Sequence, residues 1–170
     1  MKGRELSIVM RDPALTVPLA AHQWLAEHLG KVGHVLGLHG AIRVYLADDA
    51  EMSRVHRDYM GIEQTTDVIT FNMSESSAKH PKPHPGDLGS SCGSVLYGID
   101  TDIWVGVDEA RRQALVGGYP FERELLLYLV HGILHCLGWD DHDEDEAQAM
   151  HGMEDAVLSA IGVGPVYRRP

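Results

Sequence analysis

His131 and His135 lie four residues apart in the segment LVHGILHCLGWDDHDEDE, residues 129–146, which is mostly apolar as far as Gly138. At positions i and i+4 of a helix, two imidazoles share one face and converge on one point. Zinc in proteins is held by such nitrogen ligands together with a further side chain. Gly138 favours a chain reversal that returns the next polar residues to the histidine pair. The segment therefore predicts a metal site.

The third ligand of this site has two candidates. In the zinc-protease pattern H-E-x-x-H-x-x-G-x-x-H, the third histidine follows the first by ten positions. Ten positions after His131 stands Asp141, and His142 comes one position later. Zinc accepts a carboxylate oxygen as well as an imidazole nitrogen. Asp141 serves if the turn keeps the spacing of the pattern, and His142 serves if the turn carries one extra residue.

Gly132 occupies the position at which zinc proteases carry the glutamate that acts as general base. A glycine inside a helix costs about 1 kcal/mol relative to alanine, so we expect another part of the chain to approach the helix backbone there. Without that glutamate, the pattern favours a metal-dependent hydrolase of another kind. A zinc metalloprotease is the alternative that Gly132 disfavours.

The elements that must position these residues alternate along the chain. Period-two patterns predict strands, and apolar residues three and four apart predict helices. The predicted strands are 5–10, 41–47, 66–73 and 102–107, and the predicted helices are 17–33, 48–61, 108–115, 121–138 and 143–161. This order predicts one α+β domain over residues 1–170, with a mixed four-stranded sheet packed with helices. Apolar residues surround most of helix 121–138, so the metal site is expected on a central, buried helix.

Residues 74–100 break the alternation, because they are rich in proline, glycine and serine. Such a composition predicts a long loop. We interpret it as an insertion between the third and fourth strands, either a surface loop or an arm over the metal site.

The composition predicts a soluble, cytoplasmic protein that does not associate with membranes. Two cysteines are too few for a disulfide framework, and the longest apolar run, LLLYLVHGILHCLG, is short for a membrane span. The formal net charge is −11, whereas a protein that grips nucleic acid through phosphates carries a basic surface.

Three stretches resemble the YbeY family, the metal-dependent endoribonucleases of bacterial ribosomal RNA maturation and ribosome quality control. HGILHCLGWD (131–140) resembles the family signature H-G-x-L-H-x-x-G-[aromatic]-D, TTDVITF (65–71) is similar to P-T-D-V-L-S-F, and TDIWVGVDEARRQA (101–114) is similar to G-D-I-V-I-S with its following helix. The resemblance extends over nearly the whole chain. It implies an α+β metal hydrolase with one Zn²⁺ per chain, held by three side chains.

The resemblance also implies a function and partners. It indicates a zinc-dependent, single-strand-specific endoribonuclease in 16S rRNA 3′ end maturation, with His131 and His135 as catalytic metal ligands. The expected partners are single-stranded rRNA and the ribosome or its proteins. A second alternative is a ribosome-associated factor with a structural zinc and no nuclease activity of its own, which the net charge of −11 favours.

Two positions depart from the family pattern. The family has a histidine where Asp141 stands, although an ungapped alignment also brings Met150 and Glu154 onto the family's methionine and glutamate. The family has an arginine where Met60 stands, and an arginine there suits a phosphate. Arg57, one helical turn earlier, is the candidate substrate contact. Asp67 is expected to shape the start of its strand rather than to act in chemistry.

Overall fold

The described residues, 5–74, 81–89 and 95–166 of this computed structural model, form strands and helices in an alternating order. The elements are β1 (Leu6–Arg11), α1 (Leu19–Leu36), β2 (Leu38–Ala47), α2 (Asp49–Met60), β3 (Val68–Asn72), the short 3₁₀ helix η1 (Pro85–Asp87), β4 (Tyr97–Gly106), α3 (Val107–Gly117), α4 (Phe121–Cys136) and α5 (Glu144–Ala160). This arrangement confirms the predicted α+β class.

The sheet has four strands in the order β1-β2-β4-β3. β1 and β4 both run parallel to β2, whereas β3 pairs with β4 in the antiparallel sense. The long pairing of β2 with β4 extends from Leu38↔Tyr97 to Ala47↔Gly106. The sheet is therefore mixed, as predicted, and its antiparallel strand β3 lies at one edge.

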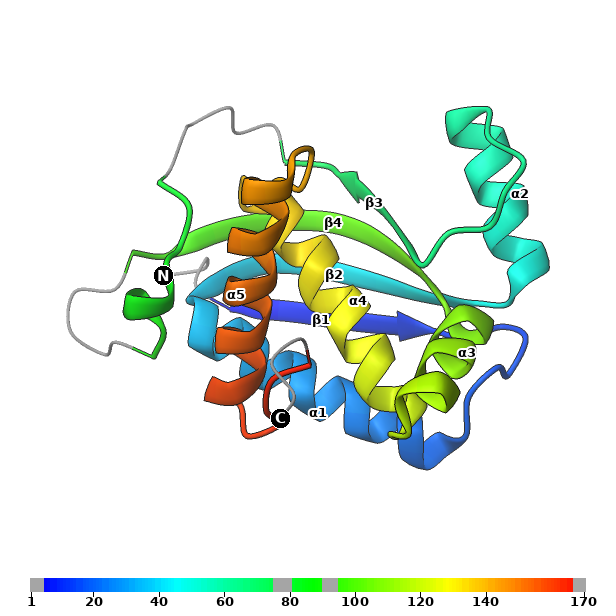
Figure 1. Cartoon of the computed structure of the whole chain (residues 1–170), viewed down its shortest axis with the longest axis horizontal. Coiled ribbons are helices and arrows are strands. Elements are labelled where there is room, and N and C mark those ends of the chain that lie inside the picture. The colour runs from blue at the N-terminus through cyan, green and yellow to red at the C-terminus, as the bar shows by residue number, and fades with distance from the viewer. Residues whose placement is uncertain (1–4, 75–80, 90–94, 167–170) are drawn as a thin grey trace.

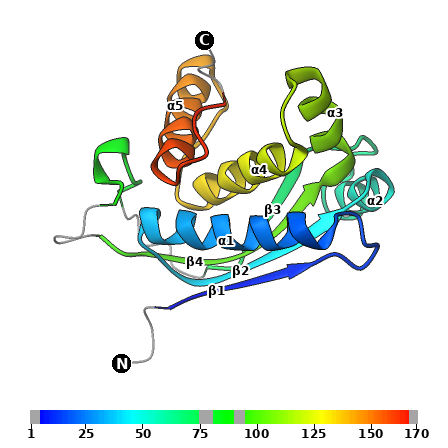
Figure 2. The same cartoon turned by 90° about the horizontal axis from the view of Figure 1, so that it is seen from below.

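The helices cover mainly one face of this sheet. α1 and α4 lie directly on that face, and α3 and α5 form an outer layer over α4 (Figures 1 and 2). α2 lies at one end of the sheet, where its Met52 and Val55 pack with Ile69 in a small second core. None of the helices in the described ranges is long and apolar enough to cross a membrane. α4 is thus enclosed between the sheet and the outer helices.

α4 is buried on nearly all sides. Its large apolar side chains, Leu125, Leu126, Leu129, Ile133 and Leu134 among them, are fully buried. Removing that much apolar surface from water is the main force that fixes the position of the helix, at about 25 cal/mol per Å². A helix fixed in this way is a rigid support for the histidines that it carries.

Strand β3 makes the close approach that Gly132 predicts. A Cβ atom at Gly132 would lie 2.8 Å from Cγ2 of Thr70 and 3.4 Å from Cγ2 of Val68. The first distance is shorter than van der Waals contact allows, so even alanine requires a shift of the Thr70 side chain, of β3 or of α4. The position has no room for the glutamate of a zinc protease.

The predicted loop 74–100 ends earlier than the sequence suggested. β4 begins at Tyr97 rather than at residue 102, because Tyr97 and Ile99 are buried and pair with β2. Within 81–89 the chain forms η1 and is held by the indole of Trp139, which donates to the carbonyl oxygen of Pro83 at 3.1 Å. Residues 75–80 and 90–94 of the predicted loop lie outside the described residues.

Candidate metal centre

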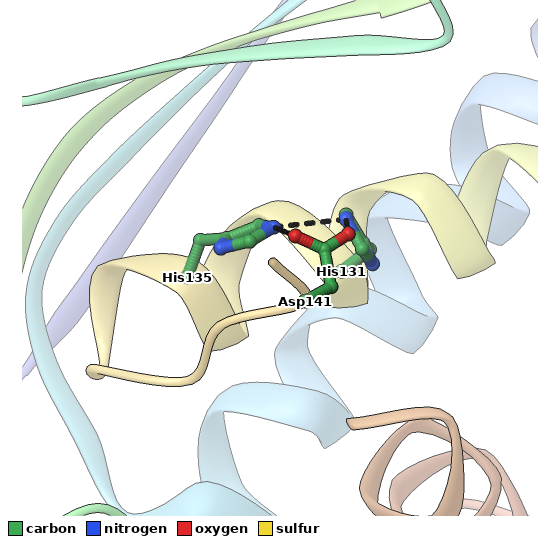
Figure 3. A group of neighbouring side chains, drawn as sticks. All are labelled: His131, His135 and Asp141. Atoms are coloured by element: carbon green, nitrogen blue, oxygen red, sulfur yellow. Dashed lines mark hydrogen bonds and ion pairs between the residues drawn. The ribbon is translucent and has the colours of Figure 1, made fainter. Parts of the chain in front are cut away.

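The imidazoles of His131 and His135 face each other on one side of α4, with their Nε2 atoms 3.0 Å apart (Figure 3). The Asp141 carboxylate faces both rings. Its Oδ2 lies 3.6 Å from Nε2 of His131, and its Oδ1 lies 3.5 Å from Nε2 of His135. The candidate ligand atoms of the three residues all lie within 4.8 Å of one another. Two nitrogens and a carboxylate thus converge on one point.

A tight reversal after α4 brings Asp141 to this position. Gly138 has a φ of 96°, in the left-handed region that glycine adopts without strain. The amide of Trp139 donates to the carbonyl oxygen of Leu134 at 3.0 Å, which closes the end of the helix. The chain then passes back along the helix face that carries the histidines. The glycine of the motif is therefore needed for the turn itself.

Both imidazoles are held through their Nδ1 atoms. Nδ1 of His135 donates to the carbonyl oxygen of Trp139 at 3.1 Å, since a carbonyl can only accept. Nδ1 of His131 is bonded to Oε1 of Glu154 at 2.5 Å, and Glu154 is fully buried in α5. With hydrogen on Nδ1, each ring directs the lone pair of Nε2 towards the shared point. Two lone pairs at 3.0 Å repel unless a cation lies between them, so the residues fit a metal ion.

The surrounding charges also favour a cation. Burial lowers the pKa of His131, but the hydrogen bond and charge of Glu154 and the charges of Asp141 and Asp67 outweigh it and leave the pKa above its ordinary value. Oε2 of Glu154 is buried and makes no hydrogen bond among the described residues. The site thus attracts positive charge, and a metal ion supplies more of it than a single proton.

His142 lies away from the histidine pair. Its side chain is 84% exposed, and its Nε2 lies 3.2 Å from Oδ2 of Asp140. His142 does form a second possible cluster with Asp140 and Asp141, but that cluster is more exposed and includes neither His131 nor His135. Of the two candidates for the third ligand, Asp141 is the one within reach of both imidazoles.

Arg57 is exposed on α2, where its Nε lies 3.4 Å from Oδ1 of Asp58. It does not line the cavity beside the metal centre. Met60 is 52% exposed near the end of the same helix. Neither residue contacts the histidine pair.

A cavity of about 690 Å³ opens beside the metal centre. His131 and Asp141 line one part of it, and Glu124 and Tyr128, on the same face of α4 as His131, line another. Glu124 is buried and accepts a hydrogen bond from the hydroxyl of Tyr119. Burial, followed by the charge of Glu124, raises the pKa of Tyr128, which therefore remains a neutral hydroxyl. The site is an acidic cavity with two of the three candidate metal ligands, His131 and Asp141, in its wall.

Asp67 is a cavity residue whose place there the sequence analysis missed. It precedes β3 and lines the cavity together with His131 and Asp141. The T-D-V motif draws attention to this aspartate in the sequence, but an aspartate at the start of a strand is equally suited to a structural role. Sequence alone does not say that β3 lies over the histidine helix, and that packing is what brings Asp67 to the cavity.

An α+β fold with a histidine pair on its buried helix and a carboxylate facing both imidazoles suits a metal-dependent hydrolase. The family described as Endoribonuclease YbeY matches residues 13–162 of the chain. The chain therefore belongs to the YbeY family.

Similar proteins support this assignment. The chain is 37% identical over 122 residues to the endoribonuclease YbeY of Desulfitobacterium hafniense, covering 72% of each chain. It is 29% identical over 167 residues to that of Rhodopseudomonas palustris, covering 91% of this chain and 90% of the relative. A solution structure of a Thermotoga maritima protein matches with a TM-score of 0.50 and 21% identity over 91% of this chain and 89% of that chain. The likeness to that structure supports the fold alone.

Proposed function

We propose that this protein is a zinc-dependent endoribonuclease that cuts single-stranded RNA in the cytoplasm. We further propose that it acts in 16S rRNA 3′ end maturation and ribosome quality control, the roles implied by the family resemblance, together with the ribosome or its proteins. The observation that carries the proposal is the convergence of two Nε2 atoms and one carboxylate beside an open cavity, whose wall includes His131 and Asp141.

The donor set favours one zinc ion, held by His131, His135 and Asp141. Zinc commonly takes three protein ligands of this kind in catalytic sites and keeps a fourth position open. When bound, it supplies a Lewis acid that polarises a phosphate oxygen and lowers the pKa of a water molecule. Hydrogen bonds to the far nitrogen of each imidazole restrict the motion of the two histidines. The carboxylate of Glu154 orients His131, and the main-chain carbonyl of Trp139 orients His135.

The charge of the cavity bears on how RNA would be held. Among the described residues, neither lysine nor arginine lines the cavity, whereas Asp67, Glu109, Glu124 and Asp141 do. Carboxylates repel phosphates, so the metal must supply the attraction at the scissile phosphate. A partner that carries basic groups would hold the rest of the RNA, which is a reason to expect action on the ribosome. A single strand suits such a site, because its phosphate and sugar can enter a cavity that a duplex cannot.

The second candidate function is a ribosome-associated factor with a structural zinc. The acidic cavity favours this factor, because a cavity without lysine or arginine does not bind the phosphates of a substrate RNA by itself. The opening of the cavity beside His131 favours the enzyme, because structural zinc sites are closed. A zinc protease is disfavoured, since Thr70 occupies the space that a glutamate at position 132 would need.

The test is cleavage of a single-stranded ribosomal RNA fragment by zinc-loaded protein. His135→Ala, prepared in the same way, controls for a contaminating nuclease. We expect the wild type to cut and the variant to lose at least about a hundredfold in rate, because the variant lacks a metal ligand. A wild type that binds one zinc ion tightly and cuts nothing, alone or with ribosomes, would establish the structural alternative.

A further inference from the structure

Asp67 is held rigidly at the junction between the α2–β3 connection and β3. Its carbonyl oxygen accepts from the amide of Gly106, at the end of β4, at 2.8 Å. Its Oδ1 accepts from the amide of Val68 at 2.8 Å and from the hydroxyl of Thr66 at 3.1 Å. The main chain and the side chain are thus both fixed, and the carboxylate has one orientation.

The second carboxylate oxygen of Asp67 remains available. Oδ2 accepts no hydrogen bond from the residues that the structure describes. Asp67 lines the cavity together with His131 and Asp141. A carboxylate with one oxygen anchored and the other free, beside a metal centre, is suited to accept a proton.

Hydrolysis at this site is faster with a group that accepts the proton of the attacking water. In zinc proteases the proton of the attacking water goes to the glutamate that follows the first histidine. Here that position is Gly132, and Thr70 and Val68 of β3 pack against it. The strand that excludes the glutamate is the one that Asp67 immediately precedes.

The other carboxylates of the cavity are less suited to accept a proton from water, because each is fully hydrogen-bonded, buried or a candidate metal ligand. Glu109 is bonded to Gln113 and Arg112, and these bonds hold its pKa below the ordinary value. Glu124 is buried and bonded to the hydroxyl of Tyr119. Asp141 faces the two imidazoles as the candidate third ligand. Among the described residues, Asp67 is hydrogen-bonded through Oδ1 alone, and it is neither buried nor a candidate metal ligand.

We propose that Asp67 is the catalytic base of this enzyme, an inference that rests on the proposed nuclease function. The oxygen of a water molecule forms a bond to the phosphorus, and one of its protons passes to Oδ2 of Asp67. The bond between the phosphorus and one ribose oxygen breaks, and that oxygen takes a proton from solvent. Asp67 then releases its proton to solvent, so that the net reaction consumes one water molecule.

The decisive variant is Asp67→Asn. The amide oxygen of asparagine still accepts from Val68 and Thr66, so the strand start is preserved, but the amide does not take a proton at neutral pH. We expect the single-turnover cleavage rate of the zinc-loaded protein to fall about a hundredfold or more, which is the usual contribution of a general base. Zinc affinity and RNA affinity should both stay within about twofold, since catalysis of this kind is separate from binding.

Glu63→Gln is the matched control. Glu63 is exposed in the same connection before β3, and it does not line the cavity. The Glu63→Gln variant loses one negative charge, as Asp67→Asn does, and it should cut at the wild-type rate. Thr66→Ala is a second variant that keeps the carboxylate and removes one of the two bonds to Oδ1. It should slow cleavage by about two- to tenfold, the worth of one positioning hydrogen bond.

The possible outcomes distinguish a failure of Asp67 as the base from a failure of the proposed nuclease function. If the wild type and Asp67→Asn cut equally, Asp67 is not the base and the nuclease function stands. If Asp67→Asn loses its zinc, Asp67 is a ligand or a structural residue, and the inference is overturned. If the wild type cuts no RNA, the same pair is compared on bis(p-nitrophenyl) phosphate. Equal rates on that substrate, or none in either protein, overturn the inference as well.

Discussion

The carboxylate of Glu154 on α5 is bonded to Nδ1 of His131 on α4, and this bond joins α5 to the candidate metal centre. Glu154 is fully buried, and its other oxygen has no hydrogen-bond partner among the described residues. Burying an anion costs free energy unless a positive charge compensates for it. We infer that the pair of Glu154 and His131 is built for a metal-loaded state.

Replacing Glu154 with glutamine should therefore weaken zinc binding. The substitution keeps the shape of the side chain but removes its charge, so the imidazole is a poorer ligand. We expect zinc affinity to fall by about ten- to a hundredfold, measured by competition with a chromophoric chelator. Glu146→Gln, on the exposed first turn of the same helix, is the control and should bind zinc as the wild type does. An unchanged affinity in Glu154→Gln would show that the bond does not tune the metal.

The third ligand can be identified with one pair of variants. Asp141→Ala should reduce zinc affinity by at least about a hundredfold, because the carboxylate faces both imidazoles. His142→Ala should leave the affinity within about twofold, since its ring is exposed and bonded to Asp140. Equilibrium dialysis against zinc measures both. The reverse result would mean that the turn rearranges on metal binding and that His142 is the ligand.

Gly132→Ala should destabilise the fold, although alanine is the better helix former. The new Cβ would meet Thr70 at 2.8 Å, and overpacking of this kind typically costs about 1–3 kcal/mol. The loss should appear as a lower midpoint of urea unfolding. Gly30→Ala, inside α1 with nothing within 4 Å of its new Cβ, should instead gain up to about 1 kcal/mol.

A double variant locates the cause of that destabilisation. Thr70→Ser removes the methyl group that Gly132→Ala would strike, so the double variant should be less destabilised than the sum of the single variants. Strictly additive effects would mean that the clash with Thr70 is not the source.

Arg57 as an RNA contact stays a prediction. Its guanidinium is exposed and, within the described ranges of the chain, makes only a long contact with Asp58, so it is available to a phosphate. Arg57→Ala should weaken RNA binding, and the slope of log affinity against log salt should become shallower by about 0.7 for a single strand. Arg112→Ala is the control, because that guanidinium is already engaged by Asp49 and Glu109. Equal salt slopes for the wild type and Arg57→Ala would remove Arg57 from the RNA interface.

Much of the fold follows from local patterns in the sequence. The α4 segment is apolar around most of its circumference and is the central helix, and the capping aspartate Asp48 opens α2 through a bond to the amide of Glu51. The start of β4 was placed too late, because Tyr97 and Ile99 lie beyond the glycine-rich stretch and are strand only through their long-range pairing with β2.

The candidate site was predictable in part. The histidine pair and the turn at Gly138 are local features of one segment, and local features can be read from spacing. The choice between Asp141 and His142 depends on the path of a turn, and the place of Asp67 depends on which strand packs over α4. Both are tertiary properties, and spacing along the chain does not encode them.

The bond between Glu154 on α5 and His131 on α4 affects the order in which the metal centre assembles during synthesis. Ribosomes synthesise the chain from its amino end, so His131 emerges first, then His135 and Asp141, and Glu154 last. Until α5 has left the exit tunnel and docked, the imidazole of His131 has no buried carboxylate to orient it. All three candidate ligands are therefore synthesised before the carboxylate that orients one of them, and the metal centre is incomplete until α5 has formed and docked on α4.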